Sequence, residues 1–346
     1  MARKLCIPKD YSPALDIKQT EKAIRLIKEF FQTNLAFELN LVRATAPLFV
    51  PGGAGINDDL NGVEKPVHFS AKDLGGTRVE IVQSLAKWKR MALADYRYGP
   101  GEGIYTDMNA IRPDEELGNL HSLYVDQWDW ERVLPSQDRN LTALRKIVTG
   151  IYDVMRRTEK YLCHNYEGIR PLLPDSITFL HSEDLLERYP HMSAREREYK
   201  ACREYGAIFV IGIGGALKDG TLHDDRAPDY DDWSTPTDAG HKGLNGDIIV
   251  YYPVLDCALE LSSMGIRVDA AALKRQLEIR GCMDRTGLLF HKRLLANELP
   301  QSIGGGIGQS RLCMLYLRKA HIGEIQCSIW PEPMREACRK GSIPLL

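Results

Sequence analysis

The chain has 346 residues, 44% of them hydrophobic and 27% charged, and its 45 basic side chains nearly balance 47 acidic ones. This composition excludes intrinsic disorder and predicts a globular protein of one large or two ordinary domains. The longest apolar run, residues 206–217, is too short to cross a bilayer, and the charged N-terminus lacks a secretory core, so we expect a cytoplasmic protein. A net charge of −2 argues against nucleic acid as the main partner.

Several familiar motifs are absent from the sequence. The eight cysteines form no CxxC pair, which disfavours zinc knuckles and thioredoxin-like redox sites. The patterns GxxxxGK[ST], HExxH and GxSxG do not occur. The run that follows the apolar strand before Gly212 lacks the third glycine of GxGxxG, which disfavours a dinucleotide-binding site. The chemistry is therefore expected from other segments.

The hydrophobic pattern predicts alternating helices and strands without repeats. Ile24, Ile27, Phe31 and Leu35 recur at helical spacing behind Thr20–Glu21, which predicts an opening helix. The alternation of Phe37, Leu39 and Leu41 then predicts a strand, which Pro47 closes. Further strands are predicted at 79–82, 121–130, 207–213 and 247–252, and helices near 142–165, 193–205 and 269–280. Hairpin-like runs before Gly103 and after Arg112 favour antiparallel pairing, so the predicted fold class is α+β in one continuous domain.

Two segments place an arginine where it can meet a ligand. Arg112 follows the strand-like run 103–105 and offers a planar, charged fork to a phosphate, with a solvated turn as the alternative. The run 304–308 has four glycines in five residues, which lets the backbone approach a flat ligand. Arg311, in the helix expected next, could stack on a nucleobase. A loose surface loop is the alternative for this run.

Acidic and basic residues in two further segments suggest ligand contacts. Glu260 and Ser263 can supply the oxygen ligands that Mg²⁺ prefers between nucleotide phosphates. Arg267 can face a substrate carboxylate, although a structural ion pair would give the same spacing. Lys89 is a second candidate for the carboxylate, with an ordinary basic helix face as its alternative. Five aspartates between residues 224 and 232 add negative potential, and a solvated acidic loop is the ordinary interpretation.

These segments together resemble the class II aminoacyl-tRNA synthetases, particularly the aspartate-specific branch. The opening helix and strand resemble motif 1, the Arg112 segment motif 2, and the glycine run with Arg311 motif 3. The stretches SLAKWKR (84–90), YVDQWDWER (124–132), RAPDYDDWSTP (226–236) and GGGIGQSRL (304–312) more closely resemble ammonia-dependent asparagine synthetases, the aspartate–ammonia ligases. The likeness runs from about Leu15 to the C-terminus. Residues 1–14 then look like an N-terminal extension and residues 15–346 like a single catalytic domain.

The resemblance implies a class II catalytic domain with a mainly antiparallel sheet flanked by helices, assembled as a homodimer. The implied activity is ATP-dependent synthesis of L-asparagine from L-aspartate and ammonia through a β-aspartyl adenylate, with AMP and diphosphate released and Mg²⁺ required. It implies no nucleic-acid or membrane partner. Two alternatives stay open: an aspartate-specific synthetase paralogue that charges tRNA, and a non-catalytic sensor of aspartate and ATP.

Residue roles follow from the same resemblance. Three residues would serve the reacting groups: Asp58, near the ammonia path, and Arg112 and Gln127, at the β-carboxylate and α-phosphate. Five would bind the amino acid: Lys89 and Arg267 at its α-carboxylate, Asp129 and Asp231 at its α-ammonium, and Ser84. Seven would bind ATP: Arg112, Ser122, Val125, Glu260, Ser263, Gly306 and Arg311. Two would bind Mg²⁺: Glu260 and Asp247.

Overall fold

The structure is a computed structural model that describes residues 5–58 and 64–346. An eight-stranded sheet runs in the order β1-β5-β6-β11-β10-β9-β8-β7, and a three-stranded sheet runs β2-β4-β3. All neighbouring pairs from β5 to β8 in the large sheet are antiparallel, while the outer strands β1 and β7 pair in parallel. The predicted α+β class with a mainly antiparallel sheet is confirmed.

The elements are bounded as follows. The large sheet contains β1 (Leu41–Arg43), β5 (Gly103–Ile111), β6 (Tyr124–Val133), β7 (Thr178–His181), β8 (Ala207–Ile211), β9 (Asn245–Tyr252), β10 (Cys257–Ile266) and β11 (Ser302–Gly308). The small sheet contains β2 (Phe49–Pro51), β3 (His68–Ser70) and β4 (Arg78–Ile81). The helices are α1 (Ile17–Leu39), α2 (Ala86–Asp95), α3 (Leu141–Asn165), α4 (Ser182–Arg188), α5 (Ala194–Tyr205), α6 (Ala270–Ile279), α7 (Leu289–Leu295), α8 (Gln309–Leu317) and α9 (Glu332–Lys340).

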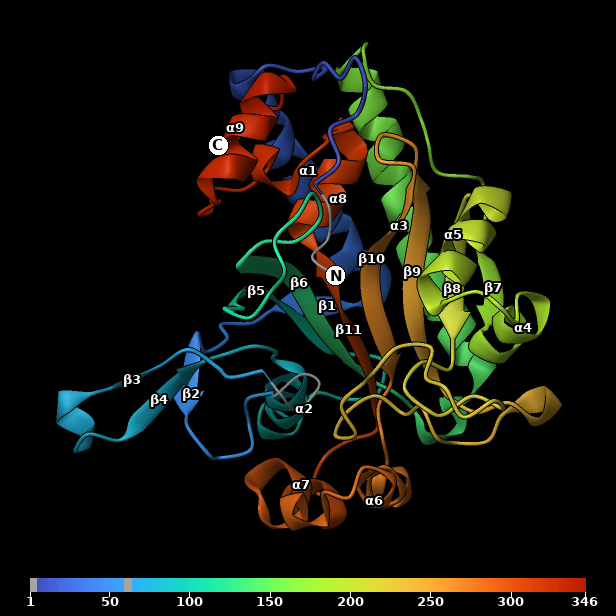
Figure 1. Cartoon of the computed structure of the whole chain (residues 1–346). Coiled ribbons are helices and arrows are strands. Elements are labelled where there is room, and N and C mark those ends of the chain that lie inside the picture. Colours follow the sequence, from blue (N-terminus) through green and yellow to red (C-terminus); the bar gives the residue numbers. More distant parts are fainter. Residues whose placement is uncertain (1–4, 59–63) are drawn as a thin grey trace.

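The main core lies between the large sheet and helices α1, α3 and α8, which pack together against one of its faces (Figure 1). The small sheet forms an arm to one side, and α6 and α7 lie at the opposite end of the body from α9 (Figure 1). In the part of the chain that the structure describes, no helix is long and apolar enough to cross a membrane.

The opening helix extends beyond its predicted limits at both ends. Asp16 caps α1 by accepting a hydrogen bond from the Gln19 amide at 2.7 Å, so the helix begins before Thr20. The strand predicted between Phe37 and Pro47 is wrong in its first part, because α1 continues to Leu39. Leu35 and Leu39 are both buried and continue the helical stripe, whereas Phe37 is 85% exposed. The strand that follows, β1, is only three residues long.

The other predicted elements are largely confirmed, with two corrections. Helices α3, α5 and α6 and strands β4, β8 and β9 match their predicted ranges within a few residues. The strand predicted from residue 121 begins at Tyr124, because residues 118–121 form a tight turn. The run before Gly103 is helix α2 and not a strand, so the hairpin consists of β5 and β6.

Alternation along β6 separates the core from the opposite face of the sheet. Trp128 and Trp130 are buried in the core, so Gln127, Asp129 and Glu131 point to the other face. Polar side chains thus share one face of a central strand. This face is the floor of the site described below.

The glycine run is neither a loop nor a turn but strand β11, paired with β6 on one side and β10 on the other. A Cβ atom at Gly305 would lie 2.4 Å from Met264 Cβ and 2.5 Å from the Ser263 carbonyl oxygen. These neighbours belong to the sheet and its core, where little can move. Glycine is therefore required by the packing of adjacent strands.

We predict that Gly305→Ala lowers the free energy of unfolding by roughly 1–3 kcal/mol, the usual cost of overpacking a core. Gly287→Ala is the matched control, since its Cβ would meet nothing within 4 Å. Urea denaturation of both variants measures the difference. Equal stability of the two variants would contradict this account of β11.

Candidate active site

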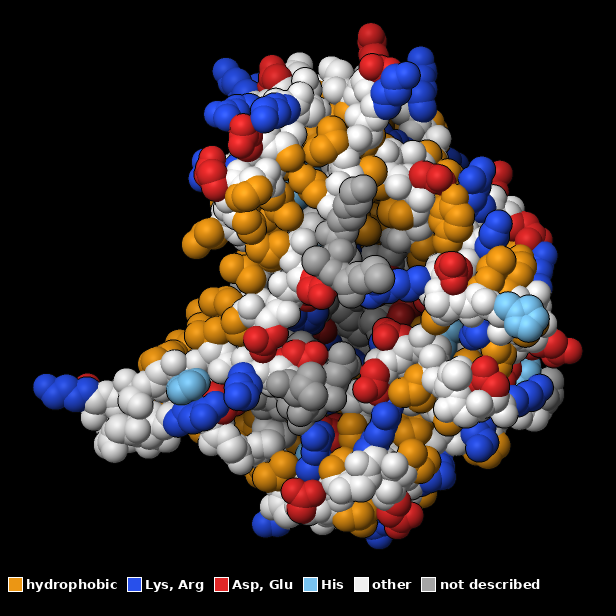
Figure 2. All heavy atoms as spheres, viewed as in Figure 1, with side chains coloured by type: hydrophobic (Ala, Val, Ile, Leu, Met, Phe, Trp, Pro, Cys, Tyr) orange, Lys and Arg blue, Asp and Glu red, His pale blue; other side chains and the backbone are white. Residues whose placement is uncertain are grey.

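A cleft of about 560 Å³ opens over the polar face of β6, β10 and β11. Figure 2 shows acidic and basic side chains gathered around a hollow at the centre of the molecule. Twelve of the fifteen residues predicted for the site line this cleft: Ser84, Arg112, Ser122, Val125, Gln127, Asp129, Asp231, Glu260, Ser263, Gly306, Arg267 and Arg311. The remaining three, Asp58, Lys89 and Asp247, lie behind residues that line it.

A buried network of charges forms one end of the cleft. Lys89, at 0% exposure in α2, forms an ion pair with Asp129 and donates to the Trp130 carbonyl oxygen at 2.9 Å. Arg267, just after β10, forms an ion pair with Asp231. The two cations come from separate elements but meet on the face of β6. Both predicted carboxylate-binding residues are thus placed beside both predicted ammonium-binding residues.

Glu131 joins the two ion pairs. Its carboxylate accepts from Arg267 Nε at 3.1 Å and Nη2 at 2.8 Å and from Ser302 Oγ at 2.7 Å, and Lys89 Nζ lies 3.9 Å away. Burial alone would raise the pKa of Glu131, but Arg267 and Lys89 outweigh it and lower that pKa. The carboxylate therefore stays ionised and holds the guanidinium of Arg267 in a fixed orientation.

The glycines of β11 provide space for this network. A Cβ atom at Gly304 would lie 2.0 Å from Glu131 Oε2 and 2.7 Å from Arg267 Nη2. At Gly306 it would lie 2.3 Å from Gln127 Oε1. Each glycine thus leaves the volume that a polar side chain of the site occupies. This role differs from the predicted approach of the backbone to a flat ligand.

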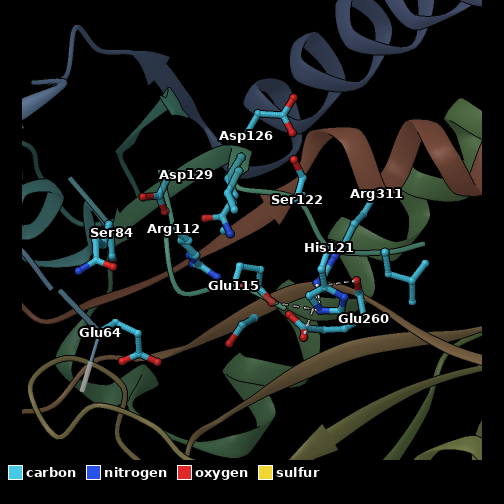
Figure 3. Close-up of a pocket in the computed structure, with 18 of the residues that line it drawn as sticks. Glu64, Ser84, Arg112, Glu115, His121, Ser122, Asp126, Asp129, Glu260 and Arg311 are labelled. Atoms are coloured by element: carbon cyan, nitrogen blue, oxygen red, sulfur yellow. Dashed lines mark hydrogen bonds and ion pairs between the residues drawn. The ribbon is translucent and has the colours of Figure 1, made fainter. Parts of the chain in front are cut away.

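The opposite end of the cleft is formed by Arg311 and its neighbours. Arg311 donates to His121 Nε2 at 3.1 Å and to the Glu260 carbonyl oxygen at 3.2 Å, and its guanidinium lies 3.5 Å from the Glu260 carboxylate. Glu115 lies 4.0 Å from His121. Figure 3 shows these four side chains together, apart from Ser84 and Asp129.

Arg112 and Gln127 lie between the two ends. Arg112 begins the loop between β5 and β6, where its amide donates to the Leu123 carbonyl oxygen at 2.8 Å. Within the described residues, its Nε atom is buried without a hydrogen-bond partner. Figure 3 shows the side chain extending into the cleft between Asp129 and Glu115. A guanidinium held in this way is available to an anionic group.

Asp58 approaches the site from outside the sheet. Its carboxylate accepts a hydrogen bond from the Tyr230 hydroxyl at 3.0 Å, and Tyr230 itself lines the cleft. The neighbouring Asn57 side chain accepts from the amides of Asp58 at 2.9 Å and Gln83 at 2.8 Å. The turn is therefore organised by Asn57, and the Asp58 carboxylate is directed to Tyr230.

The two residues predicted to bind Mg²⁺ lie in different environments. Glu260 lines the cleft with its carboxylate 44% exposed, and Ser263 lies beside it. Asp247 is buried in an ion pair with Arg226, which lines the cleft in front of it. Within residues 5–58 and 64–346, no group of three or more His, Cys, Asp and Glu side chains is arranged to hold a metal. Glu260 thus fits a cation that also binds phosphates, which needs only one or two protein carboxylates.

Comparison with known proteins identifies the family. A sequence model of the aspartate–ammonia ligase family matches residues 18–342. The aspartate–ammonia ligase of Bacteroides thetaiotaomicron is 60% identical over 339 residues, which cover 98% of each chain. That of Clostridium perfringens strain SM101 is 53% identical over 343 residues, covering 99% of each.

The chain belongs to the aspartate–ammonia ligase family.

Solved structures show the fold that the ligase family shares with synthetases. An asparaginyl-tRNA synthetase from Pyrococcus horikoshii, complexed with asparaginyl-adenylate, has a TM-score of 0.64 at 16% identity. The alignment covers 94% of this chain and 76% of that one. The Entamoeba histolytica enzyme with the same adenylate gives 0.63 at 14% identity, covering 90% and 66%. The predicted class II synthetase-like fold is confirmed.

Only the beginning of the acidic segment of this ligase is solvated, where the Asp224 side chain is 63% exposed. Asp229, Asp231 and Asp232 are buried, and Asp229 lies 3.1 Å from Lys87 Nζ and 3.2 Å from His291 Nε2. These buried contacts fix the second part of the segment to α2 and α7. It forms the wall of the cleft that carries Tyr230.

Sequence reasoning missed three residues of the site: Glu131, His121 and Tyr230. Glu131 had a detectable signal, because it follows Gln127 and Asp129 at the two-residue period of a strand face. His121 and Tyr230 had none, since each is defined by contacts with residues far away in the sequence.

We predict that Glu131→Gln lowers the free energy of unfolding by roughly 3–5 kcal/mol, because it leaves buried Arg267 and Lys89 without a compensating charge. Glu29→Gln is the matched control. It breaks an exposed pair with Arg25, which typically contributes about 0–1 kcal/mol. Urea denaturation at neutral pH compares them, and similar losses in both variants would refute the coupling of Glu131 to the two cations.

Proposed function

We propose that the protein makes L-asparagine from L-aspartate, ammonia and ATP through a β-aspartyl adenylate, releasing AMP and diphosphate. Membership of the ligase family supports the overall reaction. One observation most supports the chemical route. Arg112 and Gln127 lie in one cleft between two ends. One end pairs Lys89 and Arg267 with Asp129 and Asp231, and the other end contains Arg311.

The buried network suits an amino acid. Lys89 and Arg267 offer positive charge to an α-carboxylate, and Asp129 and Asp231 offer negative charge to an α-ammonium. Burial raises the pKa of both aspartates, so a cation bound beside them favours their ionised forms. The side chain of aspartate would then extend toward Arg112 and Gln127.

The Arg311 end suits a nucleotide. Arg311, with Ser122, Val125 and Gly306, would hold ATP so that its α-phosphate meets the aspartate β-carboxylate near Arg112. Both reacting groups are anions, so fixed positive charge at that point lowers the barrier to attack. The β-carboxylate oxygen forms a bond to phosphorus while the bond to the diphosphate breaks, and diphosphate leaves.

Mg²⁺ fits the Glu260 and Ser263 side of this end. When bound there with the phosphates, it would supply further charge neutralisation. Asp247 would support this Mg²⁺ site from behind the cleft lining, through its ion pair with Arg226.

Ammonia then attacks the activated acyl carbon, and AMP leaves with the former carboxylate oxygen. Because ammonia in neutral water is mostly ammonium, a carboxylate must attract the cation and accept its proton. We propose Asp58 for this role, held toward the cleft by Tyr230. Arg112 or Gln127 would stabilise the oxyanion of the tetrahedral intermediate.

A direct assay tests the function. Purified protein with aspartate, ATP, Mg²⁺ and ammonium should form asparagine, AMP and diphosphate in equal amounts. Formation of ADP and phosphate would contradict the adenylate route. Aminoacylation of tRNA would favour the synthetase alternative, and binding of aspartate and ATP without turnover would favour the sensor.

The two half-reactions should be separable by mutation. We predict that Asp58→Asn retains aspartate-dependent exchange of labelled diphosphate into ATP but loses asparagine synthesis by roughly two to four orders of magnitude, the usual contribution of general acid–base catalysis. Arg112→Lys is the contrasting variant. It keeps the charge but loses the bidentate fork, so exchange and synthesis should fall together. A parallel fall of both reactions in Asp58→Asn, or no fall in either, would exclude the ammonia role.

We also propose that the protein is a homodimer formed through the α1 side of the molecule. Large apolar side chains are exposed along α1, β1 and β2, including Phe37 at 85%, Val42 at 59% and Phe49 at 52%. An isologous interface would bury these side chains against their copies.

The double substitution of Phe37 and Val42 by aspartate should convert the dimer to a 39.1-kDa monomer in sedimentation. Ile279→Asp is the control, because Ile279 is 61% exposed and lies at the end of α6, outside α1, β1 and β2. A wild-type monomer with full activity would disprove the dimer.

A further inference from the structure

The N-terminal segment (residues 5–14) contacts a turn at the edge of the cleft. The turn consists of residues 118–121, closed by hydrogen bonds between Gly118 and His121. At its centre, the Asn119 side chain accepts from the Cys6 amide at 2.8 Å and donates to the Cys6 carbonyl oxygen at 2.7 Å. This paired contact joins two parts of the chain that are 113 residues apart.

A second segment holds the same turn from the C-terminal side. Asn119 also donates to the Ala320 carbonyl oxygen at 2.8 Å, and its own carbonyl accepts from the Ile322 amide at 2.7 Å. Tyr11 ties the N-terminal segment to this second support. Its hydroxyl lies 3.0 Å from the Glu324 carboxylate and accepts from the Ala320 amide at 3.2 Å.

The residues that follow Asn119 belong to the cleft. Leu120, His121 and Ser122 all line it, and His121 accepts a hydrogen bond from Arg311. A displacement of the turn would therefore move the partner of Arg311. The amino-acid end of the cleft is built on β6, α2 and β10 and shares none of these supports in the described part of the chain.

We infer that Asn119 and the N-terminal segment are positioning elements for the nucleotide, holding the turn so that His121 and Arg311 present a fixed surface to ATP. The inference rests on the proposed function for the identity of the ligand. None of these supporting residues contacts the reacting atoms. Their loss should weaken ATP binding and leave aspartate binding unchanged.

Steady-state kinetics of full-length variants test this inference. Asn119→Ala should raise KM for ATP roughly tenfold, the size expected when one or two hydrogen bonds that fix a turn are lost. The KM for aspartate should stay within about twofold. Tyr11→Phe, which leaves the Asn119 contacts intact, should raise KM for ATP by a smaller factor. Asn165→Ala is the control, since it removes a similar hydrogen bond, to Tyr161 at 2.7 Å, on the surface of α3.

Two further measurements test the inference independently. The first distinguishes a local change in the turn from a general loss of stability, and the second does not depend on the proposed reaction. Hydrogen exchange should be faster at the amides of residues 118–124 in Asn119→Ala and unchanged on β6 beyond Gln127. Calorimetric titration with ATP, without aspartate, should show the same loss of affinity even if no asparagine were formed. Equal rises of both KM values, or an unchanged ATP affinity in Asn119→Ala, would overturn the inference.

Discussion

The Arg267–Glu131 ion pair is the interaction on which the buried charge network at one end of the cleft depends. It joins β6 to the end of β10 across β11, and both side chains are almost completely buried. A buried charge pair of this kind survives only when its geometry is fixed and its remaining polar atoms are satisfied. Ser302, Lys89 and Asp231 provide those partners, so the arrangement constrains three neighbouring elements at once.

The Arg267–Glu131 pair can form only because β11 carries glycine beside it. A central strand normally contributes side chains to both faces of a sheet. Here Gly304 and Gly306 leave the polar face open, and Ile303 and Ile307 still fill the core. The sheet can therefore carry longer side chains from its neighbours in the space above β11. Beside Gly304, that space is occupied by Glu131 and Arg267, which hydrogen-bond to each other.

The sequence was informative where a pattern is local and uninformative where it is not. Helices α3, α5 and α6 follow from periodicity, and the motifs around Lys89, Gln127 and Arg311 indicated most of the cleft. The end of α1 was mispredicted because Phe37, Leu39 and Leu41 alternate as in a strand, although burial follows a helical stripe. Tyr230 and Asp58 are 172 residues apart, and Arg267 and Glu131 are 136 apart, so only the tertiary fold brings them together.

The paired charges also explain how such a site could select an amino acid under the proposed function. Lys89 already contacts Asp129, and Arg267 already contacts Asp231, so a zwitterion can exchange partners with existing pairs and need not bring uncompensated charge into a buried site. A ligand without the α-ammonium would add its carboxylate to a network whose negative charges remain unmatched, and burial makes that imbalance costly. A ligand without the α-carboxylate would draw Asp129 away from Lys89, whose other carboxylate neighbour, Glu131, lies 3.9 Å away. Under the proposed function, selection for both groups therefore follows from the need to keep each buried charge paired.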